Sequence, residues 1–239
     1  MSLAERMVNE GADILDLGAE SSRPGSKPIS EQEELDKLLP VIALLVKNFD
    51  VPISIDTYKP VVADAALQTG AKIINDITGL QKFPEMAEVV ARFGAGVVLM
   101  HMQGTPSTMQ VNPRYENVVQ EISEFLQASI KIAEAAGILP DQIAIDPGIG
   151  FGKSLQHNLE ILKNLDTFMQ LGKPVLLGVS RKSFIGDILQ LPAEERLGGS
   201  LAATVMGVNK GASIIRTHDI KATREAVKIA EAIIRGETY

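Results

Sequence analysis

The sequence predicts an α/β fold with a parallel sheet, because short apolar runs alternate with longer amphipathic segments along the chain. A strand of such a sheet is buried on both faces and appears as a short unbroken apolar run. Seven runs of this kind each end in polar or charged residues. They are DILDLGAESSRPG, PISIDT, KIINDI, GVVLMHM, QIAIDPG, PVLLGVSRKS and SIIRTHD. Polar groups that repeatedly follow strands indicate one shared rim, which is the active-site face of a (β/α)8, or TIM, barrel.

The segments between the runs carry apolar residues at three- and four-residue spacing, which is typical of helices. Clear examples are residues 33–49, 118–137, 155–172 and 223–236. Glycines stand just past the expected helix ends, where the left-handed conformation favours this residue. They are Gly70, Gly94, Gly137, Gly172 and Gly211. Strict alternation predicts right-handed crossovers. Since no linker divides the chain, a single domain over residues 1–239 is expected.

The strand count predicts an incomplete barrel. The chain opens directly on a helix at residues 3–12, and seven strands follow where a (β/α)8 barrel has eight. Either the sheet is open, or the barrel lacks its first strand and the loop after it. We favour the second interpretation, because the polar strand ends look like parts of one ring.

Composition excludes several classes of function. Among the 239 residues there is no cysteine, so disulfides, thiolate metal sites and a cysteine nucleophile are impossible. The net charge of −7 argues against a broad nucleic-acid surface, and any anionic ligand must meet a local basic pocket. The sequence shows neither a signal peptide nor a membrane-length apolar run. A soluble, cytoplasmic protein is therefore expected.

Polar residues at three strand ends are candidates for binding a flat heterocycle. Asp56 could instead cap the helix that begins near Pro60, and Asn75 and Asp76 could order a local turn. Asp146 is the stronger candidate, because the glycine-rich loop after it lets a ligand approach the backbone closely. Two carboxylates and an amide around one pocket suit a ring rich in N–H groups, such as an amino-pyrimidine.

The loop PGIGFGKS resembles two nucleotide-binding motifs and satisfies neither. A phosphate-cradling loop needs a glycine where Pro147 stands, although Gly152, Lys153 and Ser154 fit the end of the pattern. The dinucleotide pattern fails because its third glycine arrives one residue early. Both motifs are rejected, and Lys153 is predicted to be a solvated loop residue.

Basic and hydroxyl residues follow two further strands. Lys182 could belong to a plain basic loop tip, or it could reach into the ring as a point donor, with Ser183 at a helix start that favours a carboxylate. Arg216 and His218 alternate with a threonine and so leave the same face of their strand. Together they suit an anion, and the arginine can also stack on a flat ring.

The early loop SSRPG offers Ser22 and Arg23 to phosphate oxygens, although Arg23 could be a plain surface charge. His101 is predicted to be a hydrogen-bonded interior or rim residue rather than a metal ligand. Met100 and Phe151 are predicted to wall the pocket, with ordinary core packing as the alternative for Met100. His157 is predicted to be an exposed helical residue.

Eight segments in order resemble the signature segments of the dihydropteroate synthases, and the resemblance runs from about residue 10 to residue 220. They are GADILDLGAESSRPG, ISIDTYK, IINDI, LMHMQGTPSTMQ, DPGIGFGK, GVSRKS, RLGGSLAA and IIRTHD. The resemblance implies a TIM barrel and a transferase of folate biosynthesis. Such an enzyme condenses 7,8-dihydropterin-6-ylmethyl diphosphate with 4-aminobenzoate and releases diphosphate. It also implies magnesium (Mg²⁺) as a cofactor and a homodimer.

The resemblance implies three groups of site residues. The pterin contacts are Asp56, Asn75, Asp146 and Lys182. The diphosphate contacts are Ser22, Arg23, Arg216 and His218, with Arg216 also bordering the pterin. Ser183 corresponds to the position that meets the aminobenzoate carboxylate. Asp56, Asp146 and Lys182 are implied as catalytic residues, since the two carboxylates can stabilise a pterin carbocation that the aniline nitrogen attacks.

The sequence departs from the family pattern at its start, where the first strand and an N-V-T-P-D-S-F loop are absent. The family's magnesium-binding asparagine lies in that loop, so no magnesium residue is assigned, and poor turnover is expected. Ser22 replaces a threonine, and Gly198 replaces a frequent glutamate with a minor effect expected. Two alternatives remain: a methyltetrahydrofolate:corrinoid methyltransferase, which needs no diphosphate site, and a truncated pterin-binding barrel without turnover.

Overall fold

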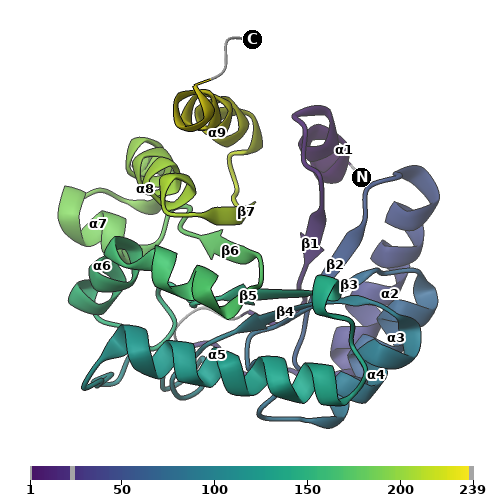
Figure 1. Ribbon diagram of the computed structural model, residues 1–239. Helices are drawn as coiled ribbons and strands as arrows, with labels where there is room; N and C mark the ends of the chain where they lie inside the picture. The colour runs from purple at the N-terminus through teal and green to yellow at the C-terminus, as the bar shows by residue number, and fades with distance from the viewer. Residues whose placement is uncertain (1, 22–24, 237–239) are drawn as a thin grey trace.

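A curled parallel sheet forms the centre of the computed structural model, which describes residues 2–21 and 25–236 (Figure 1). Seven strands in this part of the chain lie in the order β1 to β7, and each pairs in parallel with the next. They are β1 (Leu15–Leu17), β2 (Ile53–Asp56), β3 (Ile73–Asp76), β4 (Gly96–Met100), β5 (Ile143–Asp146), β6 (Val175–Gly178) and β7 (Ala212–Arg216). All seven apolar runs therefore form strands, as predicted.

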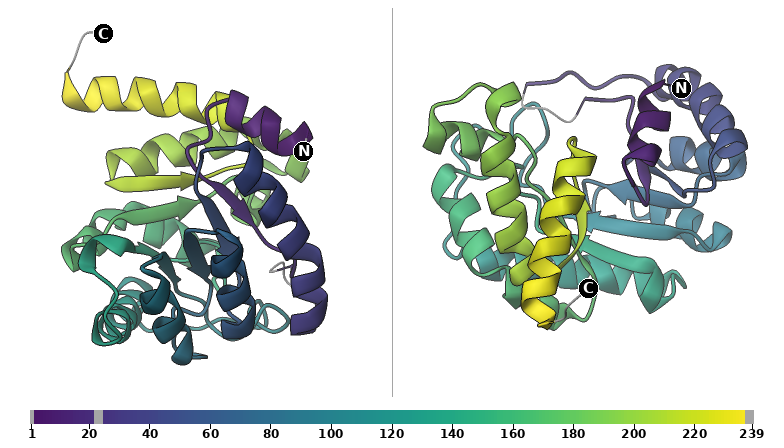
Figure 2. Two further views of the ribbon diagram at one scale, coloured as in Figure 1. Left: turned by 90° about the vertical axis from the view of Figure 1, so that its right-hand side faces the viewer. Right: turned by 90° about the horizontal axis from the view of Figure 1, so that it is seen from above.

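Helices alternate with the strands and lie on the outer side of the curved sheet (Figure 2). They are α1 (Ser2–Asn9), α2 (Glu31–Asn48), α3 (Pro60–Thr69), α4 (Glu85–Phe93), α5 (Val118–Ala135), α6 (Leu155–Lys163), α7 (Ser183–Leu189), α8 (Leu197–Asn209) and α9 (Ile220–Arg235). Short 3₁₀ turns are η1 (Pro140–Gln142), η2 (Leu165–Leu171) and η3 (Ala193–Glu195). The five predicted cap glycines all have positive φ, which confirms their role at helix ends.

The predicted continuous helix over residues 155–172 is wrong. It divides at Asn164 into α6 and η2, and the Asn164 side-chain amide donates to the Glu160 carbonyl, 2.8 Å away. In a 3₁₀ turn, residues three apart stand on the same side. That spacing places Leu165 and Phe168 together in the core, where both are fully buried.

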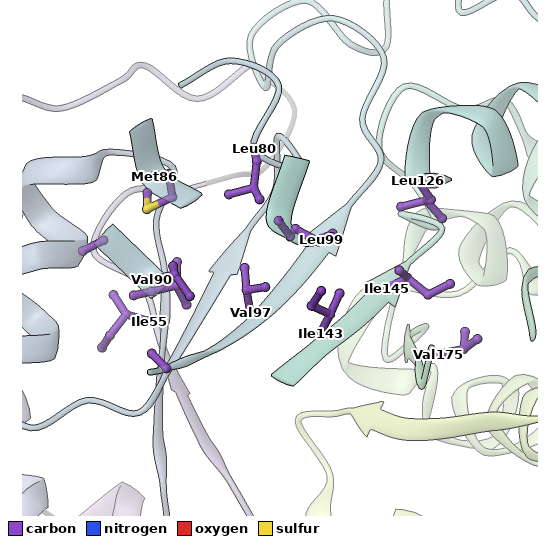
Figure 3. Packing of buried hydrophobic residues seen from close by; sticks show 14 of the residues in the cluster. Ile55, Leu80, Met86, Val90, Val97, Leu99, Leu126, Ile143, Ile145 and Val175 are labelled. Carbon is purple, nitrogen blue, oxygen red and sulfur yellow. The ribbon is translucent and has the colours of Figure 1, made fainter. Parts of the chain in front are cut away.

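The main core lies between the outer face of the sheet and the helices (Figure 3). Branched residues of the strands, such as Ile55, Leu99 and Ile145, pack there against Met86 of α4 and Leu126 of α5. A second, smaller cluster is formed by the alternate residues of the strands. It comprises Val98, Ala144 and Leu176 with Ile73 and Ile214. Because neighbouring residues of a strand face opposite sides, this second cluster marks the inner face of the curved sheet.

The sheet does not close between β1 and β7 among the described residues, and α1 and α9 stand on opposite sides of this gap (Figure 1). The helices beside the gap are poorly covered. No residue of α1 is buried, and Ile233 on α9 is 76% exposed. The fold is thus a TIM-barrel-like α/β arrangement that lacks one strand, as the strand count predicted.

Candidate functional site

The inner face of the sheet becomes polar at the carboxyl ends of the strands. Register places Asp56 of β2 beside Asn75 of β3, and Met100 of β4 beside Asp146 of β5. Asn75, Met100 and Asp146 each lie two residues beyond an inner-face residue of the same strand. Asp56 pairs with Asn75 in the sheet register and so faces the same side. The period-two alternation of parallel strands therefore gathers these side chains around one opening, as the sequence predicted.

Asp146 and Asn75 are both buried in the site, at 6% and 5% exposure. The Gly148 backbone N–H donates to Asp146 Oδ1 at 2.7 Å. Burial raises the pKa of Asp146, and the Lys182 charge and the Gly148 N–H offset part of the rise. Asn75 Oδ1 accepts no hydrogen bond from any described residue. A buried acceptor without a partner is costly, so this oxygen is suited to an N–H group of a ligand.

Lys182, which follows β6, extends its side chain to the glycine-rich loop after β5, and its role toward a ligand stays a prediction. Its ammonium donates to the Ile149 carbonyl and lies 4.9 Å from the centre of the Phe151 ring. Burial lowers the pKa of Lys182 to about 8, although Asp146 raises it in part. The lysine therefore binds the glycine-rich loop after β5 and interacts through its charge with the buried carboxylate.

Arg216 links two carboxylates across the gap in the sheet. Its Nε donates to Asp16 Oδ2 at 2.7 Å, and another guanidinium nitrogen donates to Asp56 Oδ2 at 3.2 Å. Asp16 was missed in the sequence. A polar residue between two leucines of an apolar run was the available signal, because alternation turns it away from the core-facing leucines.

Asp56 does not cap α3, whose N-cap is Lys59 without a side-chain hydrogen bond. Burial raises the pKa of Asp56 to about 7, the charge of Asp16 adds to the rise, and Arg216 opposes it. The local-turn interpretation holds for Asp76, which accepts from the backbone N–H groups of Thr78 and Leu80 at 2.8 and 2.9 Å. Asp76 thus orders the local turn, whereas ligand binding by Asn75 stays a prediction.

The pKa of Asp56 predicts how stability depends on pH. Between its ordinary value of 3.8 and about 7, the folded protein holds a proton that the unfolded chain has released. Stability should therefore fall as pH rises through this window, with a contribution from Asp56 on the order of 1 kcal/mol per pH unit. The side chain in Asp56→Asn cannot ionise. The free energy of unfolding of this variant, measured with urea at pH 4 to 8, should therefore depend less on pH.

Asp50→Asn is the matched control, because Asp50 is exposed just before β2 and carries the same charge. It should follow the pH dependence of the unchanged protein. Parallel curves for Asp56→Asn and the unchanged protein would contradict the raised pKa.

The prediction that Lys153 is solvated is wrong, because its side chain is turned inward and the residue is 3% exposed. Its Nζ lies 3.0 Å from His101 Nδ1 and 2.9 Å from the Phe151 carbonyl oxygen. Burial, together with the Lys153 charge, lowers the pKa of His101 to about 2, so the imidazole is neutral. His101 is the hydrogen-bonded interior residue that the sequence predicted, and it packs edge-on against Phe125.

Other predicted site residues lie around the same rim. Met100 is buried, Ser183 is exposed at the start of α7, and His218 Nδ1 lies 3.0 Å from Ser180 Oγ. His157 is not exposed as predicted: it is half-buried on α6 against Tyr115, with ring centres 4.9 Å apart. Ser22 and Arg23 lie outside the described residues.

The arrangement combines acceptors for a flat N–H-rich ring with cations for an anion. Asp146 and Asn75 offer the acceptors, and Lys182 and Arg216 stand beside them with positive charge. Residues 2–21 and 25–236 contain no cluster of three histidine, aspartate or glutamate side chains that could bind a metal ion. No described helix is long and apolar enough to cross a membrane.

Comparison with known proteins gives one consistent result. A family described as pterin binding enzyme matches residues 1–218. The Haemophilus influenzae dihydropteroate synthase is 46% identical over 228 residues, covering 95% of this chain and 82% of that protein. The Escherichia coli K12 enzyme is 45% identical over 234 residues, covering 98% and 83%.

Two solved structures agree with these relatives. The Yersinia pestis dihydropteroate synthase with a sulfonamide drug complex has a TM-score of 0.94 and 44% identity, covering 99% of this chain and 85% of that one. The Thermus thermophilus dihydropteroate synthase in complex with 4-aminobenzoate has a TM-score of 0.92 and 45% identity, covering 97% and 88%.

Proposed function

The chain belongs to the pterin binding enzyme family, and within it we propose that it is a dihydropteroate synthase of folate biosynthesis. It condenses 7,8-dihydropterin-6-ylmethyl diphosphate with 4-aminobenzoate to give 7,8-dihydropteroate and diphosphate. One observation carries this proposal from the structure. A buried acceptor pair, Asp146 and Asn75, lies in the same rim as Arg216, so a ring and an anion can bind side by side.

The pterin ring binds at the deep end of the site. Its 2-amino group and an adjacent ring N–H donate to Asp146, and another N–H donates to the free oxygen of Asn75. Lys182 donates to a ring acceptor from the opposite side. Met100 and Phe151 provide apolar contact with the ring faces. The Asn75 oxygen supports this orientation, because it has no other donor among the described residues, and the Asp146 carboxylate can accept further N–H bonds beside that of Gly148.

The chemistry breaks the bond between the pterin methylene carbon and the diphosphate oxygen, and the bonding electrons leave with the diphosphate. The carbocation that remains is stabilised electrostatically by Asp56 and Asp146. The aniline nitrogen of 4-aminobenzoate then forms the new C–N bond and releases a proton to solvent. Because the carbocation is highly electrophilic, no strong general base is required. A positive charge beside Asp56 also favours its ionised form.

The anion contacts complete the proposal. Arg216 leaves its two carboxylates in part to bind diphosphate, together with His218, Ser22 and Arg23. Ser183, at the exposed start of α7, binds the carboxylate of 4-aminobenzoate.

Magnesium stays a prediction. The described residues offer it no ligand cluster, so no residue is assigned to it and no step depends on it. A homodimer and a cytoplasmic location also stay predictions.

The proposed function is tested by measuring diphosphate release with both substrates present and with each one omitted. Release that requires both, with formation of 7,8-dihydropteroate, is the expected result. Methyl transfer from methyltetrahydrofolate to a corrinoid, without diphosphate release, would instead establish the alternative enzyme class. Pterin binding without either reaction would establish a binding protein.

Arg216→Ala is expected to weaken binding of the pterin diphosphate at least 10-fold, while binding of the same pterin without phosphates changes less. The reason is that arginine pairs strongly with phosphate oxygens, and a charged hydrogen bond contributes about 1.5–3 kcal/mol. Calorimetry with both ligands measures the difference. Arg216→Lys serves as the control, since it keeps the charge beside Asp16 and Asp56. Equal losses for the two ligands would mean that Arg216 serves only the ring.

A further inference from the structure

We propose that Lys153 is a positioning residue that holds the glycine-rich loop after β5, residues 147–152, against the end of β4. Through this loop it places Asp146 and Phe151 for a flat ring, without contacting the ring itself. The inference rests on the proposed function for the ligands used in its test. Its argument rests on contacts among residues that the structure describes.

The side chain of Lys153 is buried between the loop and the end of β4. Its Nζ lies 2.9 Å from the Phe151 carbonyl oxygen, 3.0 Å from His101 Nδ1 and 3.4 Å from the His101 carbonyl oxygen. An ammonium has three N–H donors, so three partners match its capacity. Lys153 thereby joins two segments that lie 52 residues apart in the chain.

The same two segments also touch through their backbones. The His101 N–H donates to the Asp146 carbonyl at 3.0 Å. Gly148 lies so close to the His101 carbonyl oxygen that a Cβ there would collide with it, and a Cβ at Gly152 would collide with the Gln103 carbonyl oxygen. Both glycines have positive φ, which other residues rarely adopt. The shape of the loop therefore depends on its contact with the end of β4.

The loop held in this way carries groups of the ring-binding site. The Gly148 N–H donates to Asp146 Oδ1 at 2.7 Å, and Lys182 donates to a carbonyl of the loop. The centre of the Phe151 ring lies 4.9 Å from the Lys182 ammonium, and Lys153 binds the carbonyl oxygen of the same phenylalanine. A shift of the loop would therefore displace an N–H partner of the carboxylate and an apolar wall of the site together.

Lys153 also acts on Asp146 through its charge. Burial raises the pKa of Asp146, and the cations Lys182, Lys153 and Arg216 oppose the rise. The neighbouring strand β4 ends in a methionine and the neutral His101, which add no charge. Burial lowers the pKa of Lys153 and Lys182 adds to the decrease, whereas Asp146 opposes it. Lys153 and Asp146 thus stabilise each other's charged forms.

Lys153→Met tests this inference, because it keeps most of the side-chain volume and removes the ammonium. Calorimetry compares two ligands: 7,8-dihydropterin-6-ylmethyl diphosphate and the same pterin alcohol without phosphates. We expect both to bind about 10-fold more weakly, and by the same factor, since they share the ring contacts and Arg216 is unchanged. A variant that disturbed the whole site would also lose phosphate contacts and would weaken the diphosphate more.

The pH profile of binding is a readout that a loss of packing alone would not move. Without the Lys153 charge, Asp146 should keep its proton to a higher pH, because a nearby cation favours the ionised form. A protonated carboxyl group offers fewer acceptor sites to ring N–H groups. As the pH is lowered from about 8 to 5, affinity for the pterin alcohol should therefore begin to fall earlier in Lys153→Met. Titration of the ligand itself is common to both proteins and cancels in the comparison.

His101→Phe is a milder second variant, because it keeps a ring beside Phe125 and removes one partner of the Lys153 ammonium. It should weaken binding of both ligands about 2- to 5-fold and keep the pH profile of the unchanged protein, since the Lys153 charge stays. Lys163→Met is the matched control. Lys163 is exposed at the end of α6, the helix after the loop, and its loss should change neither the affinities nor the profile.

A larger loss for the diphosphate than for the alcohol in Lys153→Met would overturn the proposal, since Lys153 would then support the site as a whole. Unchanged affinity for the alcohol, or an unchanged pH profile, would overturn it as well. If Lys153→Met does not fold, unchanged affinity in His101→Phe decides against the proposal. Failure of the unchanged protein to bind either ligand would instead refute the proposed function, so the two failures are distinguishable.

Discussion

Asp146→Asn is expected to weaken pterin binding about 10- to 100-fold. One carboxylate oxygen of Asp146 already accepts from the Gly148 N–H at 2.7 Å. An ionised carboxylate can satisfy that bond and still accept from the ring. An asparagine has a single oxygen, so its NH₂ group must face either Gly148 or the ring N–H groups. Two N–H groups that face each other in a buried site cost about 1–3 kcal/mol of binding free energy, which corresponds to the expected loss of affinity.

The same variant should not lose stability, and this separates a binding role from a folding role. Burial raises the pKa of Asp146, which means that its ionised form is disfavoured in the folded protein. A neutral amide removes that cost at neutral pH. Calorimetry with the pterin and thermal unfolding without it measure the two effects. Asp141→Asn, an exposed aspartate before β5, is the control. Unchanged pterin affinity in Asp146→Asn would refute this role.

Much of the fold could be predicted because its signals are local. Each apolar run is short, and a strand buried on both faces needs no distant information to be recognised. The rim residues Asp56, Asn75 and Asp146 were found for the same reason, since each directly ends a run. Asp16 could also have been predicted, because the alternation of side chains along a strand places it on the inner face of β1.

The residues that sequence reasoning misjudged depend on partners far away in the chain. Lys153 was predicted to be solvated because its loop matches no phosphate-binding motif, but its hydrogen-bond partner His101 is 52 residues away. Lys59 gave no signal at all. Glu20 and Glu34 are 39 and 25 residues from it, and only the assembled sheet brings them together. Charged groups of this kind are indistinguishable from surface residues until their partners are placed.

A strand inserted between β1 and β7 is expected to raise both the unfolding temperature and the turnover. The outer edges of these strands have no strand partner among the described residues, and unpaired edges also favour association with other chains. Arg216 already reaches Asp16 across the gap, at 2.7 Å, so the two edges lie within a side-chain span of each other. Neighbouring strands of a sheet lie about 4.8 Å apart, so one strand placed between two edges this close would pair with both.

The experiment joins a strand-forming segment and a short loop ahead of α1, which then serves as a right-handed crossover to β1. The control segment has the same length but carries prolines, which cannot donate to a sheet. For a chain of this size, each kcal/mol gained raises the unfolding temperature by about 2–4 °C. Turnover should rise because the new strand and loop exclude water from beside the carbocation. If the chain without the segment already condenses the two substrates as fast as the fused protein, then the open edge is irrelevant to catalysis.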